Sequence, residues 1–370
     1  MTKFYTHLVL IALVVIAGCG IGHAQITTPR GPSPQANVQQ TIGLSTITVD
    51  YSRPSVRDRE IYGTNLAHYG FQNLGFGTST AAPWRAGANE NTKITFSHDM
   101  TVEGKSIKAG TYGFFVAIAE SGPSTVIFSN NSTAWGSFFY DESEDALRVE
   151  VATVAIPHKE ALTFEFTEVT PTSTTLMLQW EKVGFPITIE VAVTDIVLAN
   201  IRKSMQDQPG FNRQTWEQAA AYSMANGGDL DEALKWITGA QEGNFFSQKT
   251  FANTLTKAQI LMAMEREADA MTAMDAALDT GTIFEVHQWG RTLIGAGKKD
   301  KALEVFQYNA DKNEGTWPVH YGLARAYSAK GDFKNALAHL QKAHENAPNA
   351  ASKGRVAANI AKLEKGEDIN

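Results

Sequence analysis

The feature that most constrains this 370-residue chain is a change in the spacing of its apolar residues near residue 192. Before that point apolar and polar residues alternate, as in residues 45–52 and 147–154. A period of two puts one face in the core and one in water, which is typical of antiparallel strands. After it, the apolar residues recur at helical spacing. We therefore expect segregated α+β domains, with β structure over 39–194 and helices over 195–370.

At least eight strand patterns follow one another at short spacing in the first domain, and no helical pattern of useful length interrupts them. Many short antiparallel strands with turn residues between them predict a β-sandwich, jelly-roll-like in its strand arrangement. The preceding segment, residues 25–38, is rich in Pro and Gly, and we expect it to be a flexible leader.

The helical part repeats itself. Four alanines recur at spacings of 37, 32 and 34 residues, and each is followed four residues later by a large apolar side chain: Ala233, Ala270, Ala302 and Ala336. This pattern resembles the tetratricopeptide repeat, a helix–turn–helix unit of about 34 residues. The resemblance implies about four repeats, a capping helix over 350–363 and a concave groove that binds a protein or peptide partner.

Counting back 19 residues from each alanine gives the first position of each repeat. In arrays that this one resembles, positions 2, 5, 9, 12 and 13 of the first helix line the concave face. Apart from Leu255, the side chains at positions five and nine are the groove candidates: Gln218, Tyr222, Gln259, His287, Arg291, Tyr321 and Arg325. Arg291 and Arg325 hold equivalent places in adjacent repeats, so together they suit a carboxylate or an acidic peptide. The alternative is that each arginine pairs with a local glutamate and faces solvent.

The N-terminus predicts export. Lys3 precedes an apolar run over residues 8–17, which is too short to span a membrane and is followed by small residues, as in a signal peptide over residues 1–24. Cleavage after Ala24 would release a soluble protein. Cleavage before Cys19, at a lipobox-like sequence, would leave that cysteine lipidated as the sole membrane attachment. We expect a periplasmic or outer-envelope location, and the single cysteine excludes an intramolecular disulfide.

The charge balance narrows the class of partner. The formal net charge of the whole chain is −7, and residues 25–194 carry 11 basic and 17 acidic side chains. A general nucleic-acid-binding protein needs a basic face, so we expect no nucleic-acid partner. The acidity lies mainly in the β domain and favours solubility.

No motif for catalysis, phosphate binding or metal binding stands out, so we assign no catalytic residue, metal or cofactor. The acidic run at residues 141–145 lacks the ligand spacing of a calcium loop, and we interpret it as a solvated turn. The leading interpretation is a binding or scaffold protein of the bacterial envelope. The alternative is a hydrolase that acts on cell-wall or carbohydrate material through the β domain, and enzymatic activity stays open.

One set of polar aromatic, amide and guanidinium side chains in the β domain suits a sugar or peptide ligand. Its members are Tyr51, Arg53, Trp84, Arg85, Asn89, Asn91, Trp135 and Tyr140. The competing interpretation is that the aromatic members fill the core and that Arg85 satisfies loop carbonyls.

The same region carries a family resemblance. Four stretches together look like the exported bacterial family called domain of unknown function 2911: residues 49–57, 84–92, 104–113 and 135–140. The resemblance covers roughly residues 30–195 and implies a secreted β domain that is often followed by tetratricopeptide repeats, without implying an activity. An insert over residues 67–77, rich in Gly and aromatic residues, is either a lid or padding.

Overall fold

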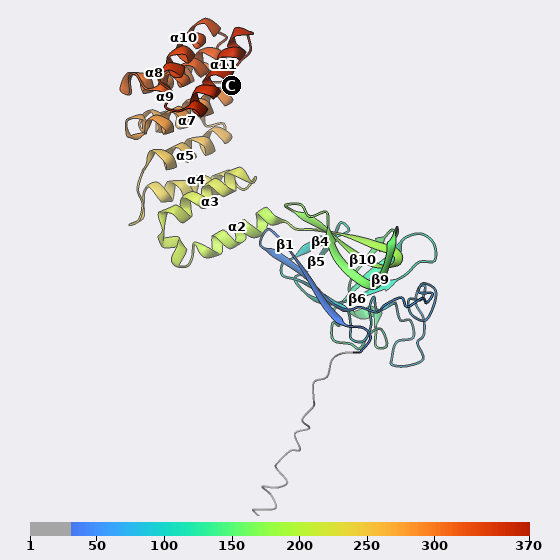
Figure 1. Ribbon diagram of the computed structural model, residues 1–370. Helices are drawn as coiled ribbons and strands as arrows, with labels where there is room; N and C mark the ends of the chain where they lie inside the picture. The colour runs from blue at the N-terminus through green and yellow to red at the C-terminus, as the bar shows by residue number, and fades with distance from the viewer. Residues whose placement is uncertain (1–30) are drawn as a thin grey trace, which may run out of the picture. The chain divides into compact units, whose positions relative to one another are not determined.

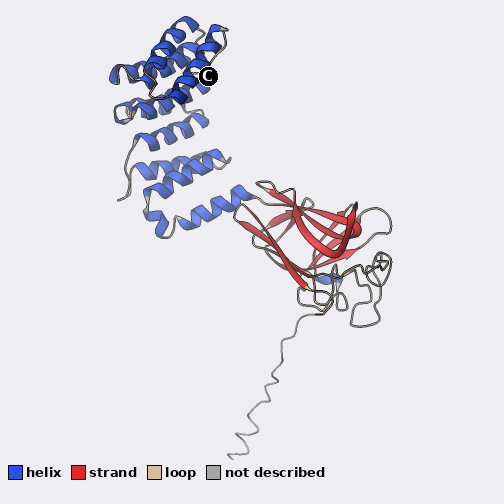
Figure 2. Cartoon of the chain, viewed as in Figure 1, coloured by secondary structure: helices blue, strands red, loops and turns tan. Residues whose placement is uncertain are grey.

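The computed structural model describes residues 31–370, which form two compact units. The boundary between the units along the chain lies between Val193 and Thr194. The first is built of strands and the second of helices, as Figure 2 shows. The expectation of segregated α and β domains is therefore confirmed. The predicted signal peptide and Cys19 lie outside the described residues.

The β unit holds two antiparallel sheets (Figure 1). The six-stranded sheet has, in spatial order, β1 (Gln35–Ile42), β2 (Ser45–Ser52), β3 (Lys93–Phe96), β6 (Gly110–Ala117), β7 (Ser124–Ser129) and β8 (Asp145–Val151). The four-stranded sheet has β5 (Lys105–Ile107), β4 (Met100–Val102), β10 (Ser173–Glu190) and β9 (Val154–Thr167).

The alternation in the sequence decides which face of each strand is buried. In β2, Ile47, Val49 and Tyr51 are buried while the residues between them are partly exposed. The inner faces of the two sheets meet through aromatic rings. Phe164 of β9 packs edge-on against Phe114 of β6 at 5.4 Å and against Tyr51 at 4.8 Å between ring centroids. This shared core confirms the predicted antiparallel sandwich.

The start of the sandwich differs from the expectation. β1 begins at Gln35, so the last four residues of the segment that we expected to be a flexible leader are strand. They pair with β2 from Gln35 opposite Ser52, and Asn37 donates a hydrogen bond to Asp50 at 2.8 Å. Proline cannot donate to a strand ladder, and the strand begins directly after Pro34.

Long connections gather at one end of the sandwich, where Figure 2 shows them as loops. They link β2 to β3 and β7 to β8. The first is tied to the sheet at Trp84, whose backbone exchanges hydrogen bonds of 3.0 and 2.9 Å with Val116 of β6. The aromatic and polar side chains of these connections are thereby fixed to a rigid support.

The helical unit begins with α2 (Val193–Ser204) and continues as helix pairs. The pairs are α3 (Arg213–Ala225) with α4 (Leu230–Gln241), α5 (Phe251–Ala263) with α6 (Glu267–Asp275), α7 (Ile283–Gly295) with α8 (Lys299–Lys312), and α9 (Trp317–Ala329) with α10 (Phe333–Glu345); α11 (Ala350–Glu364) follows. One fully buried alanine of the repeat pattern lies in each second helix: Ala233, Ala270, Ala302 and Ala336. Among residues 31–370, no helix has the length and apolar character that crossing a membrane requires.

Small residues set the packing of the third and fourth pairs. A Cβ atom at either Gly290 of α7 or Gly322 of α9 would overlap the fully buried ring of Phe306 from α8. Asn309, the departure from the small-residue pattern, is buried and donates through Nδ2 to the carbonyl of Ile283 at 2.9 Å. The larger polar side chain is accommodated because its buried amide is hydrogen-bonded to the backbone of α7.

Candidate functional site

The helical unit contains a hollow of about 190 Å³ formed by α7, α9 and α11. Its lining consists of Phe284, His287, Arg291, Trp317, Pro318, Tyr321, Arg325 and Arg355. Residues four apart on a helix share a face, which is why one helix contributes His287 with Arg291 and the next contributes Tyr321 with Arg325. The structure thus brings together four of the groove residues predicted from the sequence. The other three lie on α3 and α5, away from this lining: Gln218, Tyr222 and Gln259.

Tyr321 lies at the centre of the contacts in this hollow. The His287 ring is parallel to the Tyr321 ring, at 6.2 Å between centroids and 4° between planes. The guanidinium carbon of Arg325 lies 5.0 Å from the same ring, a cation–π geometry. The Tyr321 hydroxyl accepts a hydrogen bond from Asn359 Nδ2 at 2.7 Å. These contacts hold the aromatic floor of the hollow in one orientation.

The arginines around the hollow are not neutralised. Within residues 31–370, no carboxylate forms an ion pair with Arg291, Arg325 or Arg355. Arg325 donates through Nη1 to the carbonyl of Ile369 and to Asn370 Oδ1, both at the long distance of 3.4 Å, and its buried Nε has no partner there. The predicted alternative, pairing with a local glutamate, is not what the described residues show.

The electrostatics of His287 report the same excess of positive charge. Its pKa is lowered to about 4, first by burial and then by the charges of Arg325 and Arg291. A histidine with so low a pKa is neutral at pH 7, so it contributes an aromatic ring and no charge. The hollow therefore combines three cationic groups with an aromatic wall, and it attracts anions.

Half of the lining was missed by the sequence reasoning. Phe284 and Pro318 are at the second position of their repeats, which also faces the groove in such arrays, so the repeat count contained the signal for both. Trp317 is at the first position. Arg355 lies on α11, outside the four counted repeats, so no repeat position pointed to it.

Most of the predicted β-domain site is interior. Trp84 is 2% exposed and stacks on Trp180, with 5.9 Å between the ring centroids and 5° between the ring planes. Tyr51 is buried in the core between the sheets. Tyr140 is buried, and its hydroxyl donates to Asp145 at 2.7 Å; burial is the main cause that raises its pKa, followed by the neighbouring carboxylate. These three rings are not presented to a ligand.

The polar members of that set make structural contacts as well. Arg53 donates to the Leu162 carbonyl at 3.0 Å and to Thr163 Oγ1 at 2.9 Å, which ties it to β9. Asn91 is buried and donates to the carbonyl of Asn131 at 3.2 Å. Both side chains therefore fasten loops to strands.

The remaining three members of the set, Arg85, Asn89 and Trp135, are half-buried or exposed. Arg85 is half-buried, donates through Nη1 to the carbonyl of Asn89 at 3.0 Å, and lies 4.8 Å from the centre of the Phe138 ring. Burial lowers the pKa of Arg85, and no carboxylate in residues 31–370 pairs with it. Trp135 is 53% exposed, and the next residue, Gly136, packs directly against the Arg85 guanidinium.

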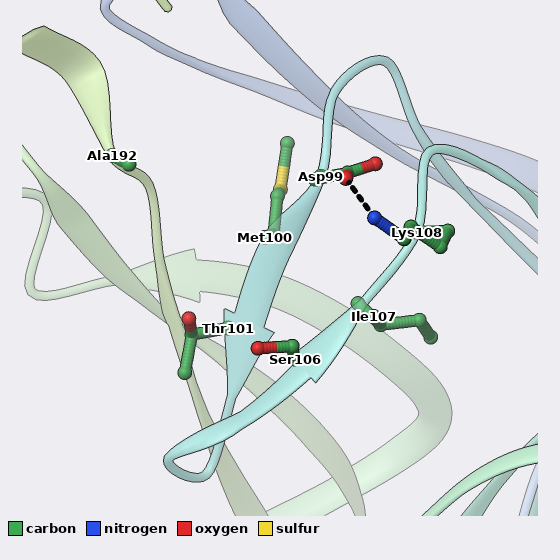
Figure 3. Close-up of a pocket in the computed structure, with 7 residues that line it drawn as sticks. All are labelled: Asp99, Met100, Thr101, Ser106, Ile107, Lys108 and Ala192. Carbon is green, nitrogen blue, oxygen red and sulfur yellow. Dashed lines mark hydrogen bonds and ion pairs between the residues drawn. The ribbon is translucent and has the colours of Figure 1, made fainter. Parts of the chain in front are cut away.

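Two further features of the described β unit, a hollow and the acidic run, show no sign of a binding site. A hollow of about 270 Å³ lies beside the β4–β5 hairpin, and two of its lining residues, Asp99 and Lys108, pair with each other at 2.8 Å. Figure 3 shows this pair. In the acidic run, Asp141 accepts from Ser143 N, and Asp145 accepts from Arg148 at 2.6 Å. No cluster of three metal-ligating side chains occurs among the residues that the structure describes.

Each of the two units contains a stretch that matches a known protein family. Residues 33–189 match the family described as a protein of unknown function, DUF2911, and residues 317–350 match the tetratricopeptide repeat. Both resemblances are thereby confirmed over these residues. No curated protein matches the chain.

Several solved structures are similar to the helical part. YrrB, a TPR protein with an unusual peptide-binding site, is 17% identical, with 45% of this chain and 84% of that one covered and a TM-score of 0.30. The C-terminal part of a TPR repeat-containing protein from Cytophaga hutchinsonii is 18% identical, with 46% and 67% covered and a TM-score of 0.35. A thermophilic TPR protein of Thermus thermophilus is 18% identical, with 46% and 91% covered and a TM-score of 0.31.

Proposed function

We propose that the chain is an exported binding protein of the bacterial envelope whose helical repeats hold a partner by a carboxylate group at Arg291, Arg325 and Arg355. Repeats of the tetratricopeptide type are modules for protein and peptide binding. The observation that carries the finer proposal is that these three arginines surround one hollow without a carboxylate partner in the described chain. An anionic group of the partner would supply the missing charge.

The size and wall of the hollow define what enters it. A volume of about 190 Å³ is below the roughly 300–1,000 Å³ of pockets that enclose a drug-sized ligand, so it accommodates about one residue of a peptide. Phe284 is 63% exposed beside the arginines, and Trp317 and Pro318 add apolar surface. We therefore expect a carboxylate on or next to an apolar residue, with the rest of the peptide lying along the concave face.

Isothermal titration calorimetry of the chain with acidic peptides tests this proposal. Loss of one charged hydrogen-bond partner should weaken binding by roughly 1.5–3 kcal/mol, so Arg291→Ala and Arg325→Ala should each raise Kd about tenfold or more. Arg202→Ala is the matched control, because this arginine is already paired with Glu232 at 2.6 Å on α2 and α4. Equal affinity in the wild type and both groove variants would refute the proposal.

Export is the second part of the proposal, and it rests on the sequence of residues 1–24. Intact-mass measurement of protein purified from its native host tests it. A mature chain that begins at Gln25 indicates soluble export, and a diacylglycerol-bearing Cys19 indicates a lipid anchor. A chain that retains residues 1–17 would contradict export.

A further inference from the structure

The exposed aromatic side chains of the described β unit all belong to two of its connections, and these connections contact each other. Five aromatic residues are exposed in the described β unit, and all of them lie on two connections, residues 67–82 and 131–141: Tyr69, Phe71, Phe76, Trp135 and Phe139. We call these five residues the aromatic surface. They belong to the end of the sandwich at which Figure 2 shows the loops gathered. Aromatic side chains gathered in water mark a site of interaction.

The two connections support each other, so the rings are held in place. Ser79 N donates to the carbonyl of Phe138 at 3.0 Å. Phe76 packs edge-on against Phe138 at 5.5 Å and against Phe139 at 6.1 Å between ring centroids. Gly77, at a φ of +80°, permits this approach, because a Cβ atom there would overlap the Phe138 carbonyl. The insert is therefore packed onto the second connection and forms part of a fixed surface.

The chemistry around the rings is neutral and polar. Residues 61–84 and 121–140 contain no Lys, Arg, Asp or Glu. Four neutral side chains near the rings are exposed and make no side-chain hydrogen bond within the described chain: Gln72, Thr78, Thr80 and Thr133. Anionic membranes and nucleic acids are bound through Lys and Arg, so this surface suits neither.

The two arginines that border the aromatic surface, Arg148 and Arg85, leave it largely neutral. Arg148 lies 5.5 Å from the centre of the Phe71 ring, but it pairs with Asp145 at 2.6 Å and with Glu142 at 2.9 Å. Arg85 is half-buried beneath Phe138 and Gly136. One partly covered guanidinium group thus remains as a directional donor at the edge.

We propose that the aromatic surface binds a neutral carbohydrate. A sugar ring presents a face of C–H groups that stacks on an aromatic side chain, and its hydroxyl groups pair with neutral amides and hydroxyls. This surface offers both kinds of group on one rigid support. The inference gives a ligand class to the β domain of the proposed binding protein. It stands apart from the arginine hollow, because the two sites lie in different units of the chain.

Affinity electrophoresis of the full chain tests the inference. Native gels would contain laminarin, mannan, dextran or hydroxyethyl cellulose as the probe, and retardation in at least one of them is expected. Phe76→Ala and Trp135→Ala, which change 66% and 53% exposed side chains, should each weaken that binding. Loss of one ring contact corresponds to a roughly threefold to tenfold rise in the apparent dissociation constant.

Two controls separate this inference from the function proposed for the repeats. Phe245→Ala removes an aromatic side chain that is 86% exposed in the helical unit, and it should leave the retardation unchanged. Arg325→Ala should also leave it unchanged while weakening acidic peptides. Absence of retardation in all four gels, retardation that persists in both aromatic variants, or binding to anionic phospholipid vesicles instead would overturn the carbohydrate proposal and leave the peptide proposal standing.

Discussion

Arg325 and Tyr321 form a cation–π pair, with the guanidinium carbon 5.0 Å from the ring centre, on a helix face that has no carboxylate to neutralise the arginine among residues 31–370. His287 stacks on the same ring and remains uncharged. The positive charge is therefore positioned by aromatic contacts, and the hydrogen bonds that the guanidinium group donates through Nη1 and Nη2 are all long, at 3.4 Å, so a carboxylate could replace them.

Tyr321→Phe separates the ring from its hydroxyl. The variant keeps the ring that Arg325 lies on and loses the hydrogen bond from Asn359 at 2.7 Å together with the long one from Arg325 Nη2 at 3.4 Å. We expect the free energy of unfolding to fall by about 0.5–1.5 kcal/mol and peptide affinity to change less than threefold. Thermal unfolding followed by helical circular dichroism, together with calorimetry, checks both. A loss of binding as large as that of Arg325→Ala would show that binding needs the hydroxyl, either as a ligand contact or as the group that orients Arg325.

Acidification should destabilise the helical unit through His287. Its pKa is about 4 in the folded chain and 6.5 in an unfolded one, so the unfolded state binds more protons between these values. Stability is therefore lost as the pH falls from about 6.5 to 4, by roughly 2–3 kcal/mol for this group.

The measurement is helical unfolding at pH 7 and pH 4.5 for the wild type and His287→Gln. Burial also lowers the pKa values of His320 and His339, so the informative quantity is the difference between the two proteins. The variant should lose less stability on acidification. Identical losses in both proteins would mean that His287 is not the group responsible.

Gly322→Ala tests the packing of α8 against α9. An added methyl group would overlap the buried Phe306 ring, and we expect a loss of about 1–3 kcal/mol from overpacking. Gly295→Ala is the matched control, because nothing lies within 4 Å of a Cβ atom there. That change should be neutral or stabilise by up to about 1 kcal/mol, since alanine favours the helix. Thermal unfolding of the two variants, followed by helical circular dichroism, measures both changes in stability.

Truncation to alanine should destabilise the protein strongly at Trp84 and hardly at all at Trp135. Trp84 is buried against Trp180, so Trp84→Ala should cost about 3–5 kcal/mol in stability. Trp135 is 53% exposed, and Trp135→Ala should change stability by less than about 0.5 kcal/mol. Near-ultraviolet circular dichroism of the β unit during denaturation measures both. Equal destabilisation by the two substitutions would contradict the burial of Trp84 or the exposure of Trp135.

These two tryptophans also show where sequence reasoning reached its limit. A period of two assigns a residue to the inner or outer face only within a strand, and both tryptophans lie in connections between strands. Trp84 is interior because its backbone pairs with Val116 across the sheet, a long-range contact that no local pattern reveals. Of the aromatic surface, only Trp135 was predicted as a ligand contact. The insert that carries Tyr69, Phe71 and Phe76 was predicted as a lid or padding, since the surface is assembled from two loops that are distant in the sequence.

The helical half was easier to predict. Close helix crossings require small residues, and Ala233, Ala270, Ala302 and Ala336 therefore mark the phase of each repeat. That phase was enough to place Arg291 and Arg325 at one hollow. Arg355 was not predictable in this way, because it comes from a helix beyond the counted repeats.

The most direct test of the central claim is a double-mutant cycle between a ligand carboxylate and Arg325. One acidic peptide that binds the chain, and the same peptide with that carboxylate converted to an amide, would be titrated by calorimetry against the wild type and Arg325→Ala. The account predicts that the amide costs roughly 1.5–3 kcal/mol with the wild type and much less with Arg325→Ala. An equal cost with both proteins would show that the carboxylate does not bind at Arg325 and would contradict the account.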